Sequence, residues 1–486
     1  MVQDSIARAN NPDSVRRAQM AETLTNIANF GIRFVTMLKS FGLQYSNSNA
    51  SVLPGYMGTA SILGMDPSNG WAPWPSFVLG YNEGLVERLR QDDLLSRDPL
   101  MNNAHNNTVN RMLSFQASVE PIRDFKIDIN ANQTYQSREE YYYKYLTEWD
   151  RVDGPLSYIM SGSYSTTTWS WGTAFVDDSL LYETFLQNRH VVSDRLADLN
   201  PDVLTDMQVL DTMSGQYYRY GYGPNQSSVL LTSFLATYLG KDAATYGFSP
   251  FLDFPLPNWS INYNGLNKIP ALKKWFNNIS ISHKYTSTYS IGSYYTDASI
   301  SGKEGYDYGH ETVFNTNGDF IPPVSMEGVQ ISEQFNPLIR LSVSMTNSIQ
   351  LNFSLQKNRT LNLSFSNNQL TETTRDGITF GGGYRFKDVA VDVKVADQTH
   401  HLKSDIVLQL NLTYNSNMTR IRKINQNFSQ ISSGSEVWMA EISAEYALSS
   451  SLTLRAFFQT NINTPFISNS YPNSTTKGGI TVRFSF

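Results

Sequence analysis

The stretch "LSVSMTNSIQLNFSLQKNRTLNLSFS", residues 341–366, decides the fold class of this chain. Within each of its three runs, 341–346, 349–356 and 360–366, every second position is apolar, as in Leu341, Val343 and Met345. Most positions between them carry serine, threonine, asparagine or glutamine. Because a strand has a side-chain period of two, this pattern places the apolar residues on one face and the polar residues on the other. The stretch therefore predicts antiparallel strands joined as hairpins.

The alternation continues to the end of the chain, with turn-sized polar gaps at Asn347-Ser348 and Lys357-Asn358. The predicted strands are nine in number: "LSVSMT" (341–346), "IQLNFSLQ" (349–356), "TLNLSFS" (360–366), "ITFGGGYRF" (378–386), "VAVDVKV" (389–395), "IVLQLNLTY" (406–414), "VWMAEISAEYAL" (437–448), "LTLRAFF" (452–458) and "ITVRFSF" (480–486). The longer ones reach about 8–12 residues, the length of a tilted membrane-spanning strand. Strands of soluble proteins centre on about five or six residues.

Composition excludes several functions. The chain has 486 residues, no cysteine and a formal net charge of -6, and 16% of its residues are charged. The lack of cysteine excludes disulfides, thiolate metal sites and cysteine nucleophiles, and the net charge leaves no basic footprint for nucleic acid. No run of about 18 apolar residues is present, so no spanning helix is predicted. Residues 1–20 lack the apolar region of a secretory signal.

Two fold classes share the alternating pattern. In a soluble β-sandwich the apolar faces meet in a dry core, whereas in an outer-membrane barrel they face lipid and the polar faces line a lumen. Strand length favours the barrel. So do aromatic residues near strand ends, which suit interfacial girdles, namely Tyr384, Phe386, Tyr414, Trp438 and Phe486. The predicted fold class is all-β transmembrane, an antiparallel outer-membrane β-barrel, and the sandwich is the alternative.

Three regions follow one another along the chain. Residues 1–164 hold irregular barrel strands with a Pro- and Trp-rich loop at 48–110, and residues 259–486 hold regular transmembrane hairpins. Residues 165–258 break the alternation, because "SLLYETFLQNRHVVSDRL" and "VLLTSFLATYL" within them have helical spacing. We expect this part to be a mostly helical extracellular cap insertion, folded over one mouth of the barrel.

Loop lengths assign the two ends of the barrel. If Phe486 lies at the periplasmic rim, the long segments 295–337 and 415–435 lie outside the cell, and Asn347-Ser348 lies on the periplasmic side. Long loops outside and short turns inside are typical of outer-membrane barrels. A miscounted strand would invert every assignment upstream of the error.

No motif in the sequence carries catalytic or metal chemistry. The six histidines do not form HExxH or another close metal-ligand spacing, and the pair His400-His401 is interpreted as a solvated turn. No GxSxG is present, and "GGGYRF" (381–386) leads from one strand into another, so it is no phosphate loop. We expect neither enzyme activity nor a cofactor nor a metal.

Two sets of residues are candidates for function. The apolar face of the last strand consists of Ile480, Val482, Phe484 and Phe486, and a terminal aromatic at the periplasmic rim is an expected signal for barrel assembly. Loop aromatics are candidates for docking a partner or for plugging barrel space, because Trp and Tyr dominate interface hot spots. They are Tyr56, Trp71, Trp74 and Trp259.

Several long stretches resemble one family, the SprA/Sov outer-membrane translocon of the Bacteroidetes type IX secretion system, also called a gliding-motility protein. They occur in the order of that family and cover nearly the whole chain. Among them are "WAPWPSFVLG" (71–80), "VEPIRDFKIDINANQTYQSREEYY" (119–142), "GYGPNQSSVLLTSFLATYLGKDA" (221–243), "SPFLDFPLPNWSINYNGLNKIPALKKWF" (249–276), "ISISHKYTSTYSIGSY" (279–294) and "GGITVRFSF" (478–486).

The resemblance implies a very large outer-membrane barrel that passes folded cargo to the cell surface. It implies as partners the secreted cargo proteins, a companion outer-membrane barrel that serves as cargo shuttle, a periplasmic plug and outer-membrane lipid. Family members are several times longer, so the chain is expected to be their C-terminal portion and to leave an unpaired sheet edge near its N-terminus. The alternative is a self-contained outer-membrane porin or nutrient channel.

Overall fold

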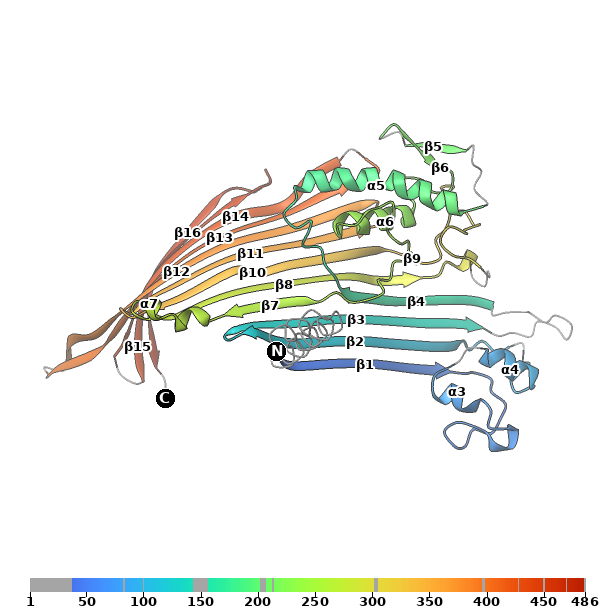
Figure 1. Ribbon diagram of the computed structural model, residues 1–486, viewed down its shortest axis with the longest axis horizontal. Helices are drawn as coiled ribbons and strands as arrows, with labels where there is room; N and C mark the ends of the chain where they lie inside the picture. Colours follow the sequence, from blue (N-terminus) through green and yellow to red (C-terminus); the bar gives the residue numbers. More distant parts are fainter. Residues whose placement is uncertain are drawn as a thin grey trace, which may run out of the picture.

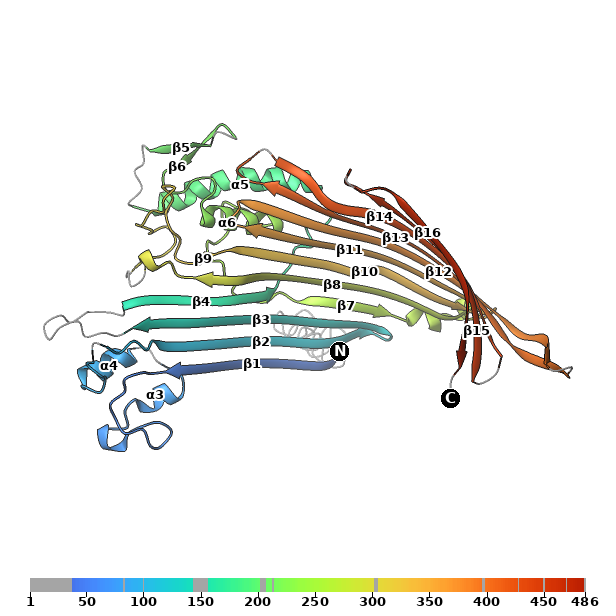
Figure 2. The ribbon, with the colours of Figure 1, turned by 180° about the vertical axis from the view of Figure 1, so that it is seen from behind.

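The computed structural model describes residues 37–81, 84–98, 100–142, 156–201, 207–211, 214–300, 305–395, 398–426, 428–448, 451–468 and 470–484. Antiparallel strands form one large sheet, and two long helices lie on one of its faces (Figure 1). Seen from behind, the described residues place no long helix on the opposite face of the sheet (Figure 2). No helix in the described part of the chain is long and apolar enough to cross a membrane.

The sheet holds fourteen strands, twelve of which form a continuous path of neighbours. In sheet order these twelve are β1 (Leu38–Val52), β2 (His105–Ile122), β3 (Phe125–Tyr142), β4 (Leu156–Thr167), β8 (Phe276–Tyr295), β10 (Gly328–Met345), β11 (Ile349–Ser364), β12 (Gln369–Val395), β13 (Gln398–Lys423), β14 (Phe428–Ala447), β15 (Leu452–Pro465) and β16 (Asn473–Phe484). Off this path, β7 (Asn258–Tyr263) pairs with β3 and β8, and β9 (Ser325–Met326) pairs with β8.

The remaining elements lie outside the sheet. They are α3 (Trp74–Val78), α4 (Leu85–Gln91), α5 (Asp178–Leu199), α6 (Ser227–Tyr238), α7 (Pro270–Lys273), the hairpin β5 (Gln208–Asp211) and β6 (Gln216–Arg219), and three short 3-10 turns. The strands reverse in tight turns at one end, at Arg123-Asp124 and at residues 346–348, and we call this the short-turn end. The other end, which α4, α5 and α6 approach, is the helical end (Figure 1).

Seven strands, not nine, follow residue 327 in the described chain, because two predicted turns lie inside strands. Lys357 and Asn358 are mid-strand in β11, where Lys357 pairs with Asp376 of β12. Residues 387–388 form a bulge inside β12, which continues to Val395. Two consecutive polar residues do not end a strand when their backbone groups remain paired with both adjacent strands. The long segment predicted at 295–337 is shorter, because residues 328–337 belong to β10. This segment and Asn347-Ser348 lie at the two ends of β10, and because the two errors remove two strands, the predicted ends relative to the last strand are unchanged.

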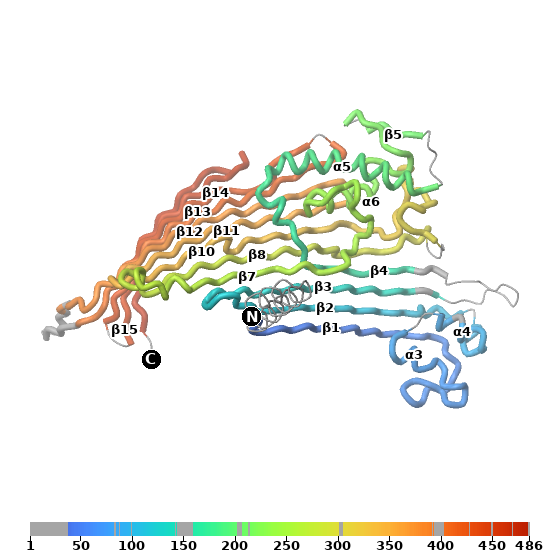
Figure 3. The backbone as a smooth tube through the Cα atoms, in the orientation of Figure 1, coloured from blue at the N-terminus to red at the C-terminus, as the bar shows by residue number. Residues whose placement is uncertain are grey.

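The long strands run past any membrane thickness. β12 has 27 residues and β13 has 26, whereas about 9–11 tilted residues cross a bilayer. Membrane thickness sets a minimum strand length and no maximum. Both strands start or end beneath α5 and extend to the short-turn end (Figure 3). The sheet therefore has a membrane-sized zone and a further zone beyond it.

The segment 168–257 is inserted between two short strands, β4 and β7, which lie end to end between β3 and β8. β4 pairs with residues 133–142 of β3, β7 pairs with residues 125–130 of β3, and both pair with β8. The two short strands thus occupy one row, and the insertion between them folds onto the sheet face (Figure 1). This placement differs from the expected cap over a barrel mouth. Both segments predicted to be helical are indeed helices, α5 and α6.

The main hydrophobic core lies between these helices and the sheet. Phe185 of α5 and Phe234 of α6 are fully buried, with ring centroids 6.5 Å apart. They belong to one buried cluster with the sheet residues Tyr289, Ile331 and Leu361. Burial of such side chains stabilises by roughly 1.5–3 kcal/mol each. The insertion is therefore a packed second layer on one half of the sheet.

Two edges of the sheet are open within the described residues. There β1 pairs only with β2, and β16 pairs only with β15. Within the described residues β1 is the edge near the N-terminus, where an open edge is predicted, and β16 is the other edge. Because unpaired strand edges are exposed backbone donors and acceptors, both edges are able to pair with further strands.

Candidate functional site

An apolar belt covers the sheet face at the short-turn side. Residues directly opposite each other in the register share a face, so the belt is read from the pairing. One row is Leu355–Ile378–Tyr414–Trp438–Ile462, across β11 to β15. Further rows contain Phe380, Leu410, Leu412, Ile442, Phe458 and Ile480, and these side chains are exposed. A contiguous exposed apolar face of this size has lipid as its natural solvent.

The height of the belt matches a bilayer. On β12 the belt runs from Ile378 to Phe386, with Phe380 and Tyr384 between them. Eight residue steps of about 3.3 Å give about 26 Å along the strand, which is about 20 Å of height for strands tilted by about 35–45°. This height is close to that of the apolar band of outer-membrane barrels, which is about 25 Å tall. The chain has the all-β outer-membrane fold that its alternation predicts.

Three of the four predicted residues of the last strand lie in this belt. Ile480, Val482 and Phe484 are on β16, and their exposed fractions are 71%, 62% and 62%. Ile480 pairs with Ala456, and Val482 pairs with Leu454 of β15. The fourth residue, Phe486, lies outside the described residues, so its predicted role in barrel assembly stays a prediction.

The opposite face of the same strands is polar and mostly uncharged. On β13 it presents Gln409, Asn411 and Thr413, which alternate with the belt residues Leu408, Leu410 and Leu412. Charged pairs on this face include Arg455 with Glu441 at 2.6 Å and Arg385 with Asp405 at 3.7 Å, and all four side chains are partly exposed. A surface of amides and hydroxyls offers a passing protein no large apolar patch to adhere to.

A boundary row separates the belt from the zone beneath the helices. Its members are opposite each other in the register: Trp259, Tyr285, Phe335, Lys357, Asp376, Ser416 and Glu436. β11 and β12 pair without a register shift, so Phe353 and Leu355 of the belt share a face with Arg359 and Leu361 beyond the boundary row. The helical insertion therefore stands on the lipid-facing side of the sheet.

A buried ion pair fixes the start of the insertion to this face. Arg359 of β11 donates to Glu333 of β10 at 2.9 Å, and the two side chains are 6% and 1% exposed. Arg359 also donates to the carbonyl and hydroxyl oxygens of Thr173, at 3.1 and 2.8 Å. The other oxygen of Glu333 accepts from Ser170 at 2.8 Å and from Tyr285 at 3.0 Å. We call this group the Glu333–Arg359 clamp.

A second ionic group holds the N-terminus of α5. Asp178 accepts from Arg420 at 2.8 Å and from Arg422 at 2.5 Å, and Arg422 also donates to Glu372 at 2.9 Å. The Arg422 guanidinium lies 4.8 Å from the ring centroid of Tyr182. Burial alone would raise the pKa of Asp178, but its hydrogen bonding with Glu372 and the arginine charges outweigh burial and leave this pKa below its usual range.

Neither ionic group was found from the sequence. A signal was present, since Glu333, Arg359, Glu372 and Arg422 sit at positions of the apolar face, where alternation predicts apolar residues. A charge at such a position indicates a partner that covers it. The partner itself is remote: Asp178 and Arg422 are 244 residues apart.

The predicted loop aromatics fall in two places. Tyr56, Trp71 and Trp74 belong to the small helical unit between β1 and β2, where the Tyr56 hydroxyl donates to Ala72 at 2.7 Å and Arg88 lies over the Trp74 ring at 4.0 Å. Tyr56 and Trp74 pack on the core of that unit, and Trp71 is exposed. The loop between the strands spans residues 53–104, slightly shorter than the predicted 48–110.

Trp259 lies apart from these residues, in β7 of the sheet. It stacks on Tyr285 with ring centroids 4.5 Å apart, and Trp169 meets it edge-on at 6.2 Å. The four predicted aromatics thus do not form one surface. Tyr56 and Trp74 help to pack a loop, and Trp259 belongs to the boundary row.

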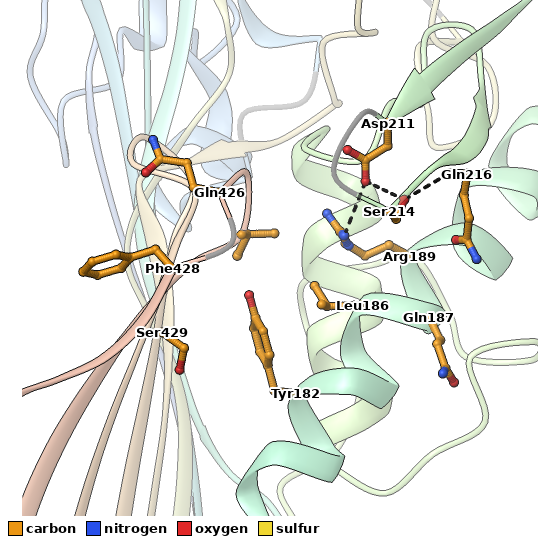
Figure 4. A pocket seen from close by; sticks show the side chains of 11 residues that line it. Tyr182, Leu186, Gln187, Arg189, Asp211, Ser214, Gln216, Gln426, Phe428 and Ser429 are labelled. Atoms are coloured by element: carbon orange, nitrogen blue, oxygen red, sulfur yellow. Dashed lines mark hydrogen bonds and ion pairs between the residues drawn. The ribbon is translucent and has the colours of Figure 1, made fainter.

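A pocket of about 300 Å³ opens at the far side of the insertion (Figure 4). It lies between α5, the β5–β6 hairpin and the start of β14, and Tyr182, Arg189, Asp211 and Phe428 are among its lining residues. Arg189 lies 4.0 Å from Asp211 and donates to the Pro224 carbonyl at 3.1 Å. Arg189 and Asp211 thus already have partners within the insertion, so we interpret the pocket as imperfect packing and not as a binding site.

A metal-ligating cluster is not found in the described part of the chain. No group of three or more histidine and acidic side chains there is arranged to hold a metal ion. His400 and His401 belong to β13, so the predicted turn at this pair is wrong.

Comparisons with known proteins give little beyond the fold. No protein-family model and no curated protein matches the chain. Among solved structures, the chain is similar to OmpT, an outer membrane protein of Vibrio cholerae in its in-vitro folded trimer form, at 11% sequence identity. The alignment covers 79% of this chain and 98% of that chain, with a TM-score of 0.21. The apolar belt and the sheet topology, not this likeness, support the outer-membrane fold.

Proposed function

We propose that this chain forms part of the barrel of an outer-membrane protein-conducting translocon, that of the type IX secretion system, which passes folded cargo to the cell surface and supports gliding motility. The observation that carries the proposal is the open sheet. Twelve strands lie side by side in one path, and within the described residues its edges β1 and β16 do not meet. A membrane barrel must pair every strand on both sides, so further strands complete this one.

The width of the sheet supports a large pore. Neighbouring strands are about 4.8 Å apart, so twelve strand positions span roughly 50 Å before any further strand is added. Barrel diameter grows about linearly with strand number, and barrels of 16–18 strands enclose only a small-solute channel. A barrel that contains this sheet and additional strands has room for a folded protein.

The chemistry of the polar face supports passive passage. Amide and hydroxyl side chains such as Gln409, Asn411 and Thr413 form transient hydrogen bonds with any cargo surface and attract neither charge sign strongly. The energy for directed transport has to come from partners. The family resemblance supplies the expected partners: a companion barrel that shuttles cargo, and a periplasmic plug that seals the pore at rest.

The function is tested by depleting the protein in a bacterium that secretes type IX cargo. We expect cargo with the C-terminal secretion signal to accumulate in the periplasm and gliding to stop. An unrelated outer-membrane porin, measured in the same cells, controls for a general assembly defect. Normal amounts of cargo at the cell surface after depletion would reject the translocon.

The alternative function, a self-contained porin or nutrient channel, requires β1 and β16 to pair with each other. A disulfide test separates the two cases. The variant Leu43→Cys on β1 and Val482→Cys on β16 would cross-link within one chain if the barrel closed on itself. We expect no such link, and efficient formation of this link, together with small single-channel conductance, would favour the porin.

A further inference from the structure

The loop that joins the sheet to α5, residues 168–177, exposes an unusual number of large apolar side chains. Trp171 is 52% exposed and Phe175 is 62% exposed, and the neighbouring Trp169 and Val176 are also exposed. Leu180 continues this surface on the first turn of α5 at 55%. We call this segment the aromatic loop. Side chains of this size are seldom left in water on a packed element without a partner.

The aromatic loop lies along the boundary row. The Phe175 ring contacts Phe335 with centroids 5.4 Å apart, and the Lys357 ammonium lies 5.8 Å from the same ring. At the other end of the loop, Trp169 meets Trp259 edge-on at 6.2 Å. Phe335, Lys357 and Trp259 are all members of the boundary row, so the loop follows the line at which the apolar belt ends.

The clamp holds the loop in this position. Thr173 and Ser170 are bound to Arg359 and Glu333 through three hydrogen bonds of 2.8 to 3.1 Å. With its backbone fixed, the loop presents Trp171 and Phe175 outward, on the side of the sheet that carries the belt. A loop so restrained has lost its conformational entropy before any partner binds.

We propose that the aromatic loop is a membrane-surface anchor, whose partner is the boundary between headgroups and acyl chains in the leaflet on the helical side. Its surface is continuous with the lipid-facing belt, which identifies lipid as the occupant. Trp at such a depth places its apolar ring in the acyl region and its N–H toward the headgroups. The Lys357 ammonium lies beside Phe175 at the same level and pairs with Asp376 at 3.5 Å; basic side chains are common at a membrane interface.

The anchor has a mechanical consequence. α5 and α6 stand above the leaflet, and their contact with the sheet passes through the clamp and the core. Contact of the aromatic loop with lipid adds a third attachment of the insertion, besides the clamp and the core, and this attachment forms only in a membrane. The inference rests on the outer-membrane fold and is independent of whether the barrel conducts proteins or small solutes.

The test places an environment-sensitive fluorophore at single cysteines in the whole native protein, reconstituted in lipid nanodiscs. The chain contains no cysteine of its own. Test positions are Phe175→Cys and Trp171→Cys. Leu410→Cys in the belt is the membrane control, and Leu199→Cys, 52% exposed at the far end of α5, is the water control. Lipids that carry a nitroxide at the headgroup or deep in the acyl chain quench fluorophores at the same depth, so they report how deep each label lies in the bilayer.

We expect both loop labels to emit at shorter wavelength than the Leu199 label and to be quenched best by the shallow nitroxide. The belt label should be quenched best by the deep nitroxide, and exchange of lipid for amphipol should remove the difference between loop and water control. Two positions are used because Phe175 also packs on Phe335, and a misfolded variant would be recognised from a lost heat-modifiable band on gels. Loop labels that emit and quench like the Leu199 label in lipid would overturn the proposal.

Discussion

The Glu333–Arg359 clamp makes a quantitative prediction about the insertion. In the variant Arg359→Met, Glu333 keeps its hydrogen bonds from Ser170 and Tyr285 but loses its counter-charge. The Thr173 hydroxyl oxygen loses its donor, and the Thr173 carbonyl keeps only the Val176 N–H, at 3.3 Å. Breaking a buried ion pair by removing one partner costs about 3–5 kcal/mol. Because every 1.4 kcal/mol is tenfold, the open population of the insertion should rise by a factor of about 10² to 4 × 10³.

The assay is amide hydrogen exchange of α5 and α6, measured by mass spectrometry on the native protein in lipid vesicles. Under conditions where reclosing is faster than exchange, the rates report the free energy of opening. The double variant Glu333→Gln and Arg359→Met replaces the charges by neutral groups of similar shape. We expect it to recover most of the loss, because the uncompensated carboxylate is gone.

An exposed ion pair provides the matched control. Arg455→Met breaks the pair with Glu441 on the polar face, and Arg455 is 44% exposed. We expect a change below about 1 kcal/mol there. The reasoning is refuted if Arg359→Met accelerates exchange less than tenfold, or if the double variant opens as readily as the single one.

Three further predictions concern the belt, the α5 terminus and the chain end. Leu410→Arg should destabilise the folded barrel by roughly 2–4 kcal/mol in urea titrations in vesicles, whereas Gln409→Arg on the opposite face of the same strand should have little effect; equal losses would contradict the assignment of faces. The lowered pKa of Asp178 means that its own contribution to the insertion is fully present above about pH 4 and is lost as the pH falls through the folded-state pKa. Exchange of α5 should therefore rise in acid, and Asp178→Asn should remove that step. The neighbouring Glu372 titrates separately, because burial and the Asp178 carboxyl raise its pKa to about 7. Deleting Phe486 should reduce the barrel in the outer membrane several-fold, read by immunoblot of membrane fractions, and unchanged levels would contradict its role in assembly.

Much of the sheet was predictable because its signal is local. The period of two requires only the strand geometry at each residue, so the faces of Leu410 and Ile442 follow from the sequence alone. The helical spacing in α5 and α6 is local in the same way. Strand ends depend on partners that are distant in the sequence. Lys357 continues β11 because it pairs with Phe335 of β10 and Asp376 of β12, and the sequence around Lys357 does not show these partners.

The docking of the insertion was beyond the sequence for a similar reason. Asp178 meets Arg422 across 244 residues and Arg359 meets Thr173 across 186, and such pairs are set by the assembled sheet. The shared row of β4 and β7 also arises only when β3 and β8 are both in place. This row decides that the insertion leaves from the middle of the sheet and lies on its lipid-facing side.

Photo-cross-linking during secretion tests the central claim most directly, namely that one face of this sheet contacts cargo and the other contacts lipid. A photo-reactive amino acid is placed at Gln409 or Asn411 on the polar face, and at Leu410 or Leu412 in the belt, while a cargo protein is stalled in transit. The account predicts cross-links to folded cargo from Gln409 and Asn411 and none from Leu410 and Leu412. Cargo cross-links from the belt positions, or none from any of the four, would contradict it.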